Sequence, residues 1–107
     1  PELAPEAALA AAALAHSRDM REAGFFGHVS PTMGGVDQRV IGKIPGLASA
    51  AEAIALAKTP QRAYANLVGS PAHAAILKDP GMDRMGVGKV KTQDGMLFTV
   101  ILAAGKD

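Results

Sequence analysis

The segment Phe25-Phe26-Gly27-His28-Val29-Ser30-Pro31 is the most informative stretch of this 107-residue sequence. Two phenylalanines precede a glycine and a histidine, and a Ser-Pro pair, which is a common turn signal, follows them. The phenylalanines can anchor the segment on the core while the imidazole of His28 points into a cleft, or His28 can cap loop carbonyls. The residues alone leave both alternatives open. They predict an irregular connection of the kind that often carries functional residues.

The sequence before this loop predicts the most secure helix. Residues from Pro5 to Ala23 are strong helix formers, and Gly24 is placed to end the helix. Apolar residues and His16 recur on one face at helical spacing. A histidine on such a stripe is more often a packed, hydrogen-bonded core residue than a ligand, so we expect His16 to be structural.

Three shorter helices are expected after the loop. Val36 to Ile41 can form the first of them. Thr59 and Ser70 each precede a proline, and the hydroxyl of such a residue can accept a backbone N–H at a helix start. Helices are therefore predicted from Pro60 to Val68 and from Pro71 to Leu77.

The last third of the chain changes character. Met85 to Lys91 and Met96 to Ala103 are strand-like, and Thr92-Gln93-Asp94-Gly95 between them has turn chemistry. They predict an antiparallel hairpin. Ser49 to Ala57 is consistent with either a helical turn or an extended segment. Helices first and a hairpin last indicate the α+β class, and the length predicts a single domain over residues 1–107.

Composition excludes several classes of function. The formal net charge is +1 and the charges form no long block, so nucleic acid is not an expected partner. No apolar run reaches the roughly 20 residues that span a bilayer. The absence of cysteine excludes disulfides and thiol nucleophiles but assigns no compartment.

Two further residues join His28 as candidates for a site. Glu52 lies in an otherwise apolar stretch, so it needs a partner if it is buried, and a histidine is the obvious candidate. The alternative is a solvated glutamate on the outer face of a helix. His73 lies in the first turn of a predicted helix, where the helix dipole favours a neutral imidazole suited to metal binding or base catalysis. The alternative is a surface residue without a role.

Taken together, the motifs of this chain resemble those of a known family. The matching blocks, in the order of the family, are Leu9 to Met20, Phe26 to Pro31, Ala51 to Ala55, Ser70 to His73, and Met85 to Gly88. They resemble the CAP superfamily, which includes cysteine-rich secretory proteins, antigen 5 and plant pathogenesis-related proteins, and most of all its cysteine-free bacterial branch. The match covers most of the chain.

The resemblance implies an α-β-α sandwich with a central cleft and a location outside the cytoplasm. His28 and Glu52 fall on positions where the family places cleft residues, and His73 is the expected third member. The sequence also departs from the family pattern. Ala53 replaces the usual asparagine and Leu67 the usual tryptophan, the histidine on a late strand has no counterpart, and the usual first helix is expected to be missing.

Three functions are compatible with these residues. The first is a binding module whose cleft, lined by His28, Glu52 and His73, holds a small ligand or a divalent metal. Zn²⁺ or another divalent cation is the candidate cofactor, with His28 and His73 as its ligands. The second is a hydrolase in which Glu52 is the general base and the two histidines assist. The third is a structural domain of a cell-envelope protein, in which a partner segment or a second copy covers the face of the missing helix.

Overall fold

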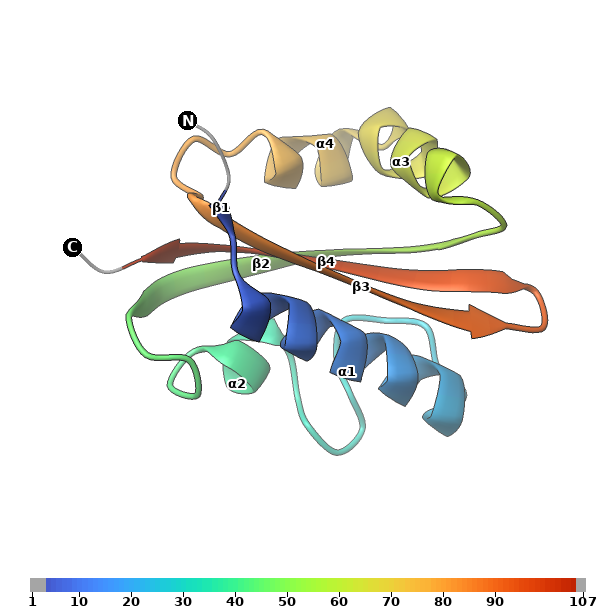
Figure 1. Ribbon diagram of the computed structural model, residues 1–107, viewed down its shortest axis with the longest axis horizontal. Helices are drawn as coiled ribbons and strands as arrows, with labels where there is room; N and C mark the ends of the chain where they lie inside the picture. The colour runs from blue at the N-terminus through green and yellow to red at the C-terminus, as the bar shows by residue number, and fades with distance from the viewer. Residues whose placement is uncertain (1–3, 106–107) are drawn as a thin grey trace.

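The computed structural model describes residues 4–105 as a sheet between two layers of helices (Figure 1). The elements are β1 (Ala4–Pro5), α1 (Ala7–Ala23), α2 (Val36–Val40), β2 (Leu47–Ala57), α3 (Pro60–Gly69), α4 (Pro71–Leu77), β3 (Arg84–Thr92) and β4 (Gly95–Gly105). Helices α1 and α2 cover one face of the sheet, and α3 and α4 cover the other. The predicted mixed fold with an antiparallel sheet is confirmed.

The sheet has the strand order β1-β3-β4-β2. Strands β3 and β4 form the predicted antiparallel hairpin, with Thr92 opposite Gly95 at its turn. Strand β2 pairs with β4 along its length and places Glu52 opposite Ile101. Ser49 to Ala57, which the sequence allowed to be either a helical turn or an extended segment, is therefore extended. Strand β2 is the last strand at one edge of the sheet.

Helix α1 begins two residues later than the sequence predicts. Pro5 belongs to β1 and pairs with Met85 in parallel, which suits a proline because an outer strand does not need its missing N–H. The helix ends at Gly24, whose φ of 73° is the left-handed conformation that glycine adopts readily. The predicted C-terminal signal is confirmed, and the start is corrected by the pairing of β1 with β3.

Helices α3 and α4 follow each other with a single residue between them. Thr59 caps α3 as predicted, because its Oγ1 accepts the Arg62 backbone N–H at 3.1 Å. Ser70 occupies the N-cap position of α4, but its hydroxyl forms no cap hydrogen bond. The expected hydroxyl cap is thus wrong for α4, because Ser70 also ends α3 and lies between two helices.

Side chains alternate between the two faces of β2 and so divide the core. Ala53, Ala55 and Ala57 pack with Leu67 on the side of α3 and α4. Ile54 packs with Met20 of α1 on the other side. Because side chains two residues apart share a face of a strand, Glu52 lies on the side of Ile54, under α1 and α2.

Candidate functional site

A buried carboxylate is the centre of the candidate site. The side chain of Glu52 is 1% exposed and lies against Arg39 of α2, whose side chain is 5% exposed. Arg39 Nη2 donates to Glu52 Oε1 at 2.8 Å, and Arg39 Nη1 lies 2.7 Å from Oε2. A buried charge needs a partner of opposite sign, and Arg39 supplies it. The solvated alternative for Glu52 is wrong.

His28 is the second partner of this carboxylate. Its Nδ1 lies 2.9 Å from Glu52 Oε1, and the side chain of His28 is 50% exposed. Because an ionised carboxylate only accepts hydrogen bonds, Nδ1 must carry the hydrogen. The other ring nitrogen, Nε2, forms no hydrogen bond within residues 4–105 and remains available for a ligand.

His16 reaches the same carboxylate from α1. Its Nε2 lies 2.8 Å from the carbonyl oxygen of Gly27 and 3.7 Å from Glu52 Oε1. The ring also packs edge to face on Phe25, with centroids 5.8 Å apart. The predicted packed and hydrogen-bonded histidine is confirmed, since His16 is 1% exposed. Its place beside Glu52 was missed.

The loop that carries His28 is tied down at several points. Arg39 Nη2 also donates to the His28 carbonyl at 2.9 Å, and Arg39 Nε donates to the Gly34 carbonyl at 3.2 Å. Ser30 Oγ donates to Asp19 of α1 and accepts the Met33 N–H at 3.0 Å. These bonds fix the position of His28 relative to the sheet, so the imidazole is presented by a firm support.

Arg39 is the functional residue that sequence reasoning did not single out. It lies in a five-residue helix and is only one of 11 basic side chains in the chain. The one available signal was indirect. Glu52 in an apolar stretch called for a partner, but a histidine was the partner expected for it, and nothing in the local sequence of Arg39 marks it as buried.

His73 lies apart from the other two predicted residues. It belongs to α4, on the face of the sheet opposite α1 and α2 (Figure 1). No hydrogen bond or ion pair joins it to His28 or Glu52 in the described structure, and its Nδ1 is buried without a partner. The structure therefore brings His28 and Glu52 together and leaves His73 outside their hydrogen-bonded cluster. Within residues 4–105, no three His, Asp or Glu side chains are grouped so that they could hold a metal ion.

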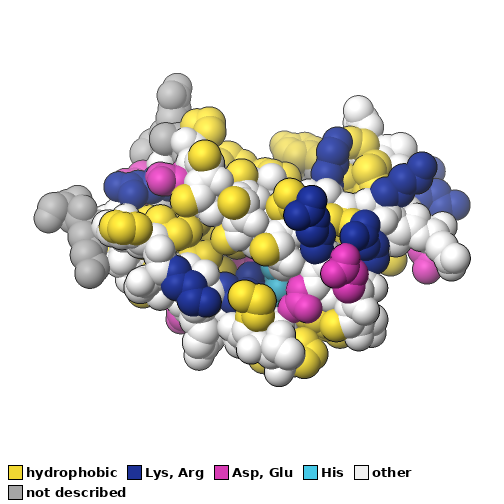
Figure 2. Space-filling view, turned by 60° about the horizontal axis from the view of Figure 1, so that its bottom comes forward, with side chains coloured by type: hydrophobic (Ala, Val, Ile, Leu, Met, Phe, Trp, Pro, Cys, Tyr) yellow, Lys and Arg dark blue, Asp and Glu magenta, His cyan; other side chains and the backbone are white. Residues whose placement is uncertain are grey.

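The surface of the site is mixed in character. Figure 2 shows a histidine side chain recessed between apolar, acidic and basic side chains. Three large apolar residues of the loop around His28 are exposed, namely Phe26 at 58%, Val29 at 69% and Met33 at 46%. Large apolar side chains exposed on the same loop as a polar side chain suit a binding surface.

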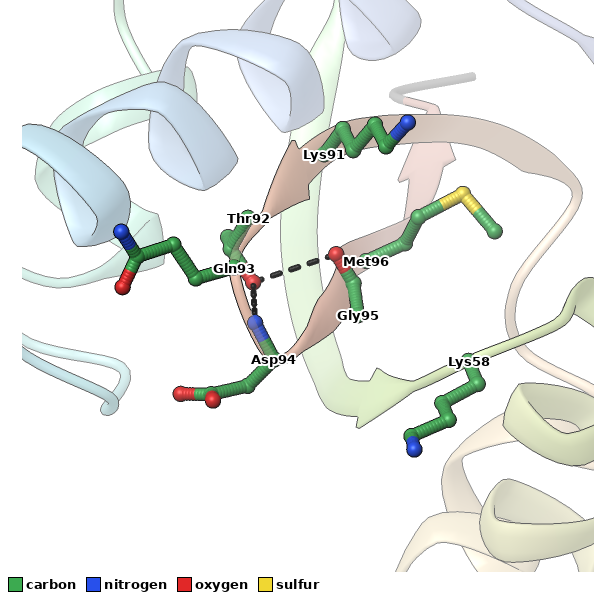
Figure 3. A pocket seen from close by; sticks show the side chains of 7 residues that line it. All are labelled: Lys58, Lys91, Thr92, Gln93, Asp94, Gly95 and Met96. Atoms are coloured by element: carbon green, nitrogen blue, oxygen red, sulfur yellow. Dashed lines mark hydrogen bonds between the residues drawn. The ribbon is translucent and has the colours of Figure 1, made fainter.

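A hollow lies at the turn of the β3–β4 hairpin. It has a volume of about 480 Å³, and Figure 3 shows Lys58, Lys91 and Asp94 on its rim. The hydrogen bonds drawn there join Thr92 to Asp94 and Gly95 and only stabilise the turn. All three charged side chains belong to exposed residues, and no residue of the predicted site lines the hollow. We therefore place the candidate site at His28.

One solved structure resembles this chain in both fold and sequence. It is an extracellular protein containing an SCP domain from Bacillus anthracis, with a TM-score of 0.83 and 28% sequence identity. The match covers 97% of this chain but 34% of that protein, so this chain spans about a third of its length. An outer surface protein from Borrelia burgdorferi has a TM-score of 0.88 at 20% identity, covering 99% of this chain and 80% of that protein. At that identity the likeness shows the fold alone.

No curated protein matches the chain. None of the helices within residues 4–105 has the length and apolar character needed to cross a bilayer. The model of the cysteine-rich secretory protein family, CAP, matches residues 1–102. Together with the α-β-α fold and a sequence free of cysteine, which fits the bacterial branch, this match shows that the chain belongs to the CAP family.

Proposed function

We propose that this domain is an extracytoplasmic binding module that contacts its ligand through the Nε2 atom of His28. The observation that carries the proposal is the pairing of a half-exposed imidazole with a fully buried carboxylate. Glu52 fixes the tautomer of His28 and the orientation of its ring, and Arg39 fixes Glu52. A polar atom held in this way on a loop that also exposes apolar side chains suits a small ligand that has both polar and apolar groups.

The location outside the cytoplasm is supported by the names of the similar structures. One is called extracellular and the other an outer surface protein. The family match adds to this support, because its name describes secreted proteins. We extend the location to this chain as part of the proposal.

A divalent cation is the form of ligand that can be tested most directly. Zinc binds imidazole and carboxylate ligands, but Glu52 does not fit as a ligand here because both of its oxygens lie against Arg39. His28 and His73 each keep a nitrogen without a protein partner. His73 belongs to α4 on the opposite face of the sheet, so it does not suit a second ligand of an ion held by His28. We therefore propose His28 as the metal contact, with water or the ligand itself at the remaining positions.

Calorimetric titration with ZnCl₂ tests this arrangement. We expect the unchanged chain to bind zinc and the variant His28→Ala to bind it at least tenfold more weakly, which corresponds to about 1.4 kcal/mol. His73→Ala changes a residue on the opposite face of the sheet and should leave binding unchanged. Asp94→Asn removes an exposed carboxylate at the hairpin turn, away from His28, and should leave binding unchanged.

The three variants distinguish the possible locations of the zinc. Absence of heat in the unchanged chain, or equal heat in His28→Ala, would show that the site does not bind zinc. A loss in His73→Ala as large as the loss in His28→Ala would contradict the assignment of the ion to the His28 face of the sheet. A loss in Asp94→Asn would place the zinc at the hairpin instead.

Hydrolysis is the second candidate, and the same pair of residues favours it. An imidazole whose Nδ1 donates to a carboxylate can act as a general base through Nε2. In this arrangement the exposed base is His28 and the buried Glu52 is its positioning residue, so the predicted role of Glu52 as the base would pass to His28. Ser30 is buried and its hydroxyl donates a hydrogen bond to Asp19, so it does not serve as the nucleophile. The nucleophile would be water.

A panel of peptide, ester and nucleic-acid substrates tests hydrolysis. If the dyad is catalytic, we expect turnover that falls by a factor of roughly 10²–10⁴ in His28→Ala, the usual contribution of a general base. His73→Ala should retain the activity. A panel without turnover, or turnover that survives His28→Ala, would contradict catalysis by the dyad.

A further inference from the structure

The edge of the sheet opposite β2 is formed mostly by β3. Strand β1 pairs with β3 only at Arg84 and Met85, because the chain turns into α1 directly after Pro5 and Glu6. Figure 1 shows β3 continuing past β1 to the hairpin turn. Within residues 4–105, the rest of β3 therefore has a neighbouring strand only on the side of β4.

The backbone groups of every second residue of β3 point toward this open edge. The Glu6 N–H donates to the Met85 carbonyl at 2.9 Å, so the backbone of Met85 faces away from β4. Because this direction alternates along a strand, Val87, Lys89 and Lys91 also face the open edge. All three are exposed residues, Val87 at 46%. Such a row of unpaired donors and acceptors is a template for another extended segment.

An apolar groove adjoins the open edge at the point where β1 leaves β3. It has a volume of about 570 Å³. Apart from Glu6, no residue that lines it has a charged or polar side chain, and the largest of these residues are Pro5, Met85 and Val87. A strand added beside Val87 would run past the groove and could place an apolar side chain in it.

The charges along the edge indicate what kind of strand fits. Gly88 faces α1, because a methyl group there would overlap Leu14, so the side chains of Lys89 and Lys91 lie on the other face of β3. Neither lysine forms an ion pair in the part of the chain that the structure describes. Opposite charges on neighbouring strands attract each other. Acidic side chains at alternate positions of an added strand would therefore match these two lysines.

A second copy of β3 does not have this charge. Only Val87 to Lys91 is open for pairing, so two copies related by a two-fold axis would meet at Lys89. The lysines of one copy would then lie opposite Lys89 and beside Lys91 of the other. Like charges in such positions are unfavourable, which argues against a dimer through this edge.

We propose that the open edge of β3 binds an extended acidic segment of a partner protein. The segment adds a strand beside Val87, Lys89 and Lys91 and places an apolar side chain in the groove. Its backbone supplies the hydrogen bonds, and the two lysines and the groove supply the specificity. This surface lies at the edge of the sheet opposite β2, which carries Glu52, so the proposal does not depend on the site at His28.

A synthetic peptide with alternating charges tests the proposal on the full chain. The probe is acetyl-Thr-Glu-Val-Glu-Val-Glu-Thr-amide with a fluorescent label, and binding is followed by anisotropy. We expect saturable binding that weakens as salt is added, because exposed charges are screened. The same peptide with lysine in place of glutamate should not bind. Absence of saturable binding at about 1 mM peptide would overturn the proposal, and the lysines would then only keep the edge free.

Amide hydrogen exchange locates the bound peptide. At a free peptide concentration about ten times the Kd, exchange at Val87, Lys89 and Lys91 should slow by roughly tenfold. Gly88 and Val90 face β4 and should change little. Unchanged exchange at the first three amides would place the peptide elsewhere and overturn the proposal.

Backbone methylation shows whether the peptide binds as a strand. One version of the peptide is N-methylated at its valines and another at its glutamates, so that the N–H groups of only one version can reach β3. We expect one version to lose binding and the other to keep it. Equal affinities of the two versions would contradict strand pairing.

Charge reversal tests the role of the two lysines. Lys89→Glu combined with Lys91→Glu should weaken binding of the acidic peptide by roughly tenfold or more and create binding of the lysine peptide. Lys43→Glu combined with Lys78→Glu is the matched control, since it changes the net charge equally at exposed residues outside β3 and the groove. Equal weakening by the two double variants would show that only the net charge matters, and the proposed edge would be wrong.

Discussion

The variant Glu52→Gln is expected to lose about 3–5 kcal/mol of its free energy of unfolding, the usual effect of breaking a buried ion pair. The substitution keeps the shape of the side chain but removes the charge that compensates Arg39. The guanidinium is 5% exposed and would remain buried without a counter-charge. Urea denaturation followed by circular dichroism measures the change. Because small domains have a total stability of only about 5–15 kcal/mol, the variant should be close to unfolded at 37 °C.

The same substitution at Glu22 is the matched control. Glu22 pairs with Arg21 at 3.1 Å, but the two side chains are 68% and 41% exposed. Exposed pairs contribute about 0–1 kcal/mol, so Glu22→Gln should change little. Adding Arg39→Met to Glu52→Gln should recover part of the lost stability, since no uncompensated charge then remains. Equal effects of Glu52→Gln and Glu22→Gln, or a double variant less stable than Glu52→Gln, would contradict the account of the ion pair.

The second large effect is expected at the contact between α1 and β3. A methyl group at Gly88 would overlap the backbone of Leu14, and one at Gly86 would overlap the backbone around Leu9 and Ala10. Backbone atoms of a helix cannot move individually, so Gly88→Ala must push α1 away from the sheet. We expect a loss of about 3 kcal/mol, at the upper end of the cost of overpacking. Thermal unfolding should show a decrease in Tm.

Gly69 provides the matched control for this substitution. It is the last residue of α3, and a methyl group there would meet nothing within 4 Å. Gly69→Ala should be neutral or slightly stabilising, because alanine reduces the entropy of the unfolded chain. If Gly88→Ala left the Tm at the value of Gly69→Ala, the close approach of α1 to β3 would be wrong.

The position of α1 matters for the site as well as for stability. His16 and Asp19 belong to α1 and fasten the loop at Gly27 and Ser30. A displacement of α1 should therefore loosen the loop and weaken binding at His28. The two glycines on β3 thus connect the packing of the sheet with the geometry of the candidate site.

The sequence by itself determined the features that depend on neighbouring residues. Gly24 ends α1 because its conformation is local, and Thr59-Pro60 starts α3 for the same reason. The hairpin was predicted from turn residues between two strand-like runs. The motif around His28, read with Ser70-Pro71-Ala72-His73 and the other matching blocks, pointed to the family and so to the fold. Glu52 was also expected to need a partner if it was buried, because a buried charge is unfavourable without one.

Only the tertiary structure decided the features that depend on distant residues. Ser49 to Ala57 became a strand because it pairs with β4, about 50 residues further along the chain, and local preference did not choose between helix and strand. Arg39 became the partner of Glu52 because α2 packs over β2, and nothing in its own surroundings in the sequence marks it. His73 was separated from the pair because a sheet has two faces and α4 covers the second. The sequence supplied the chemistry of the site, and the contacts between β2, α1 and α2 decided which of those residues meet.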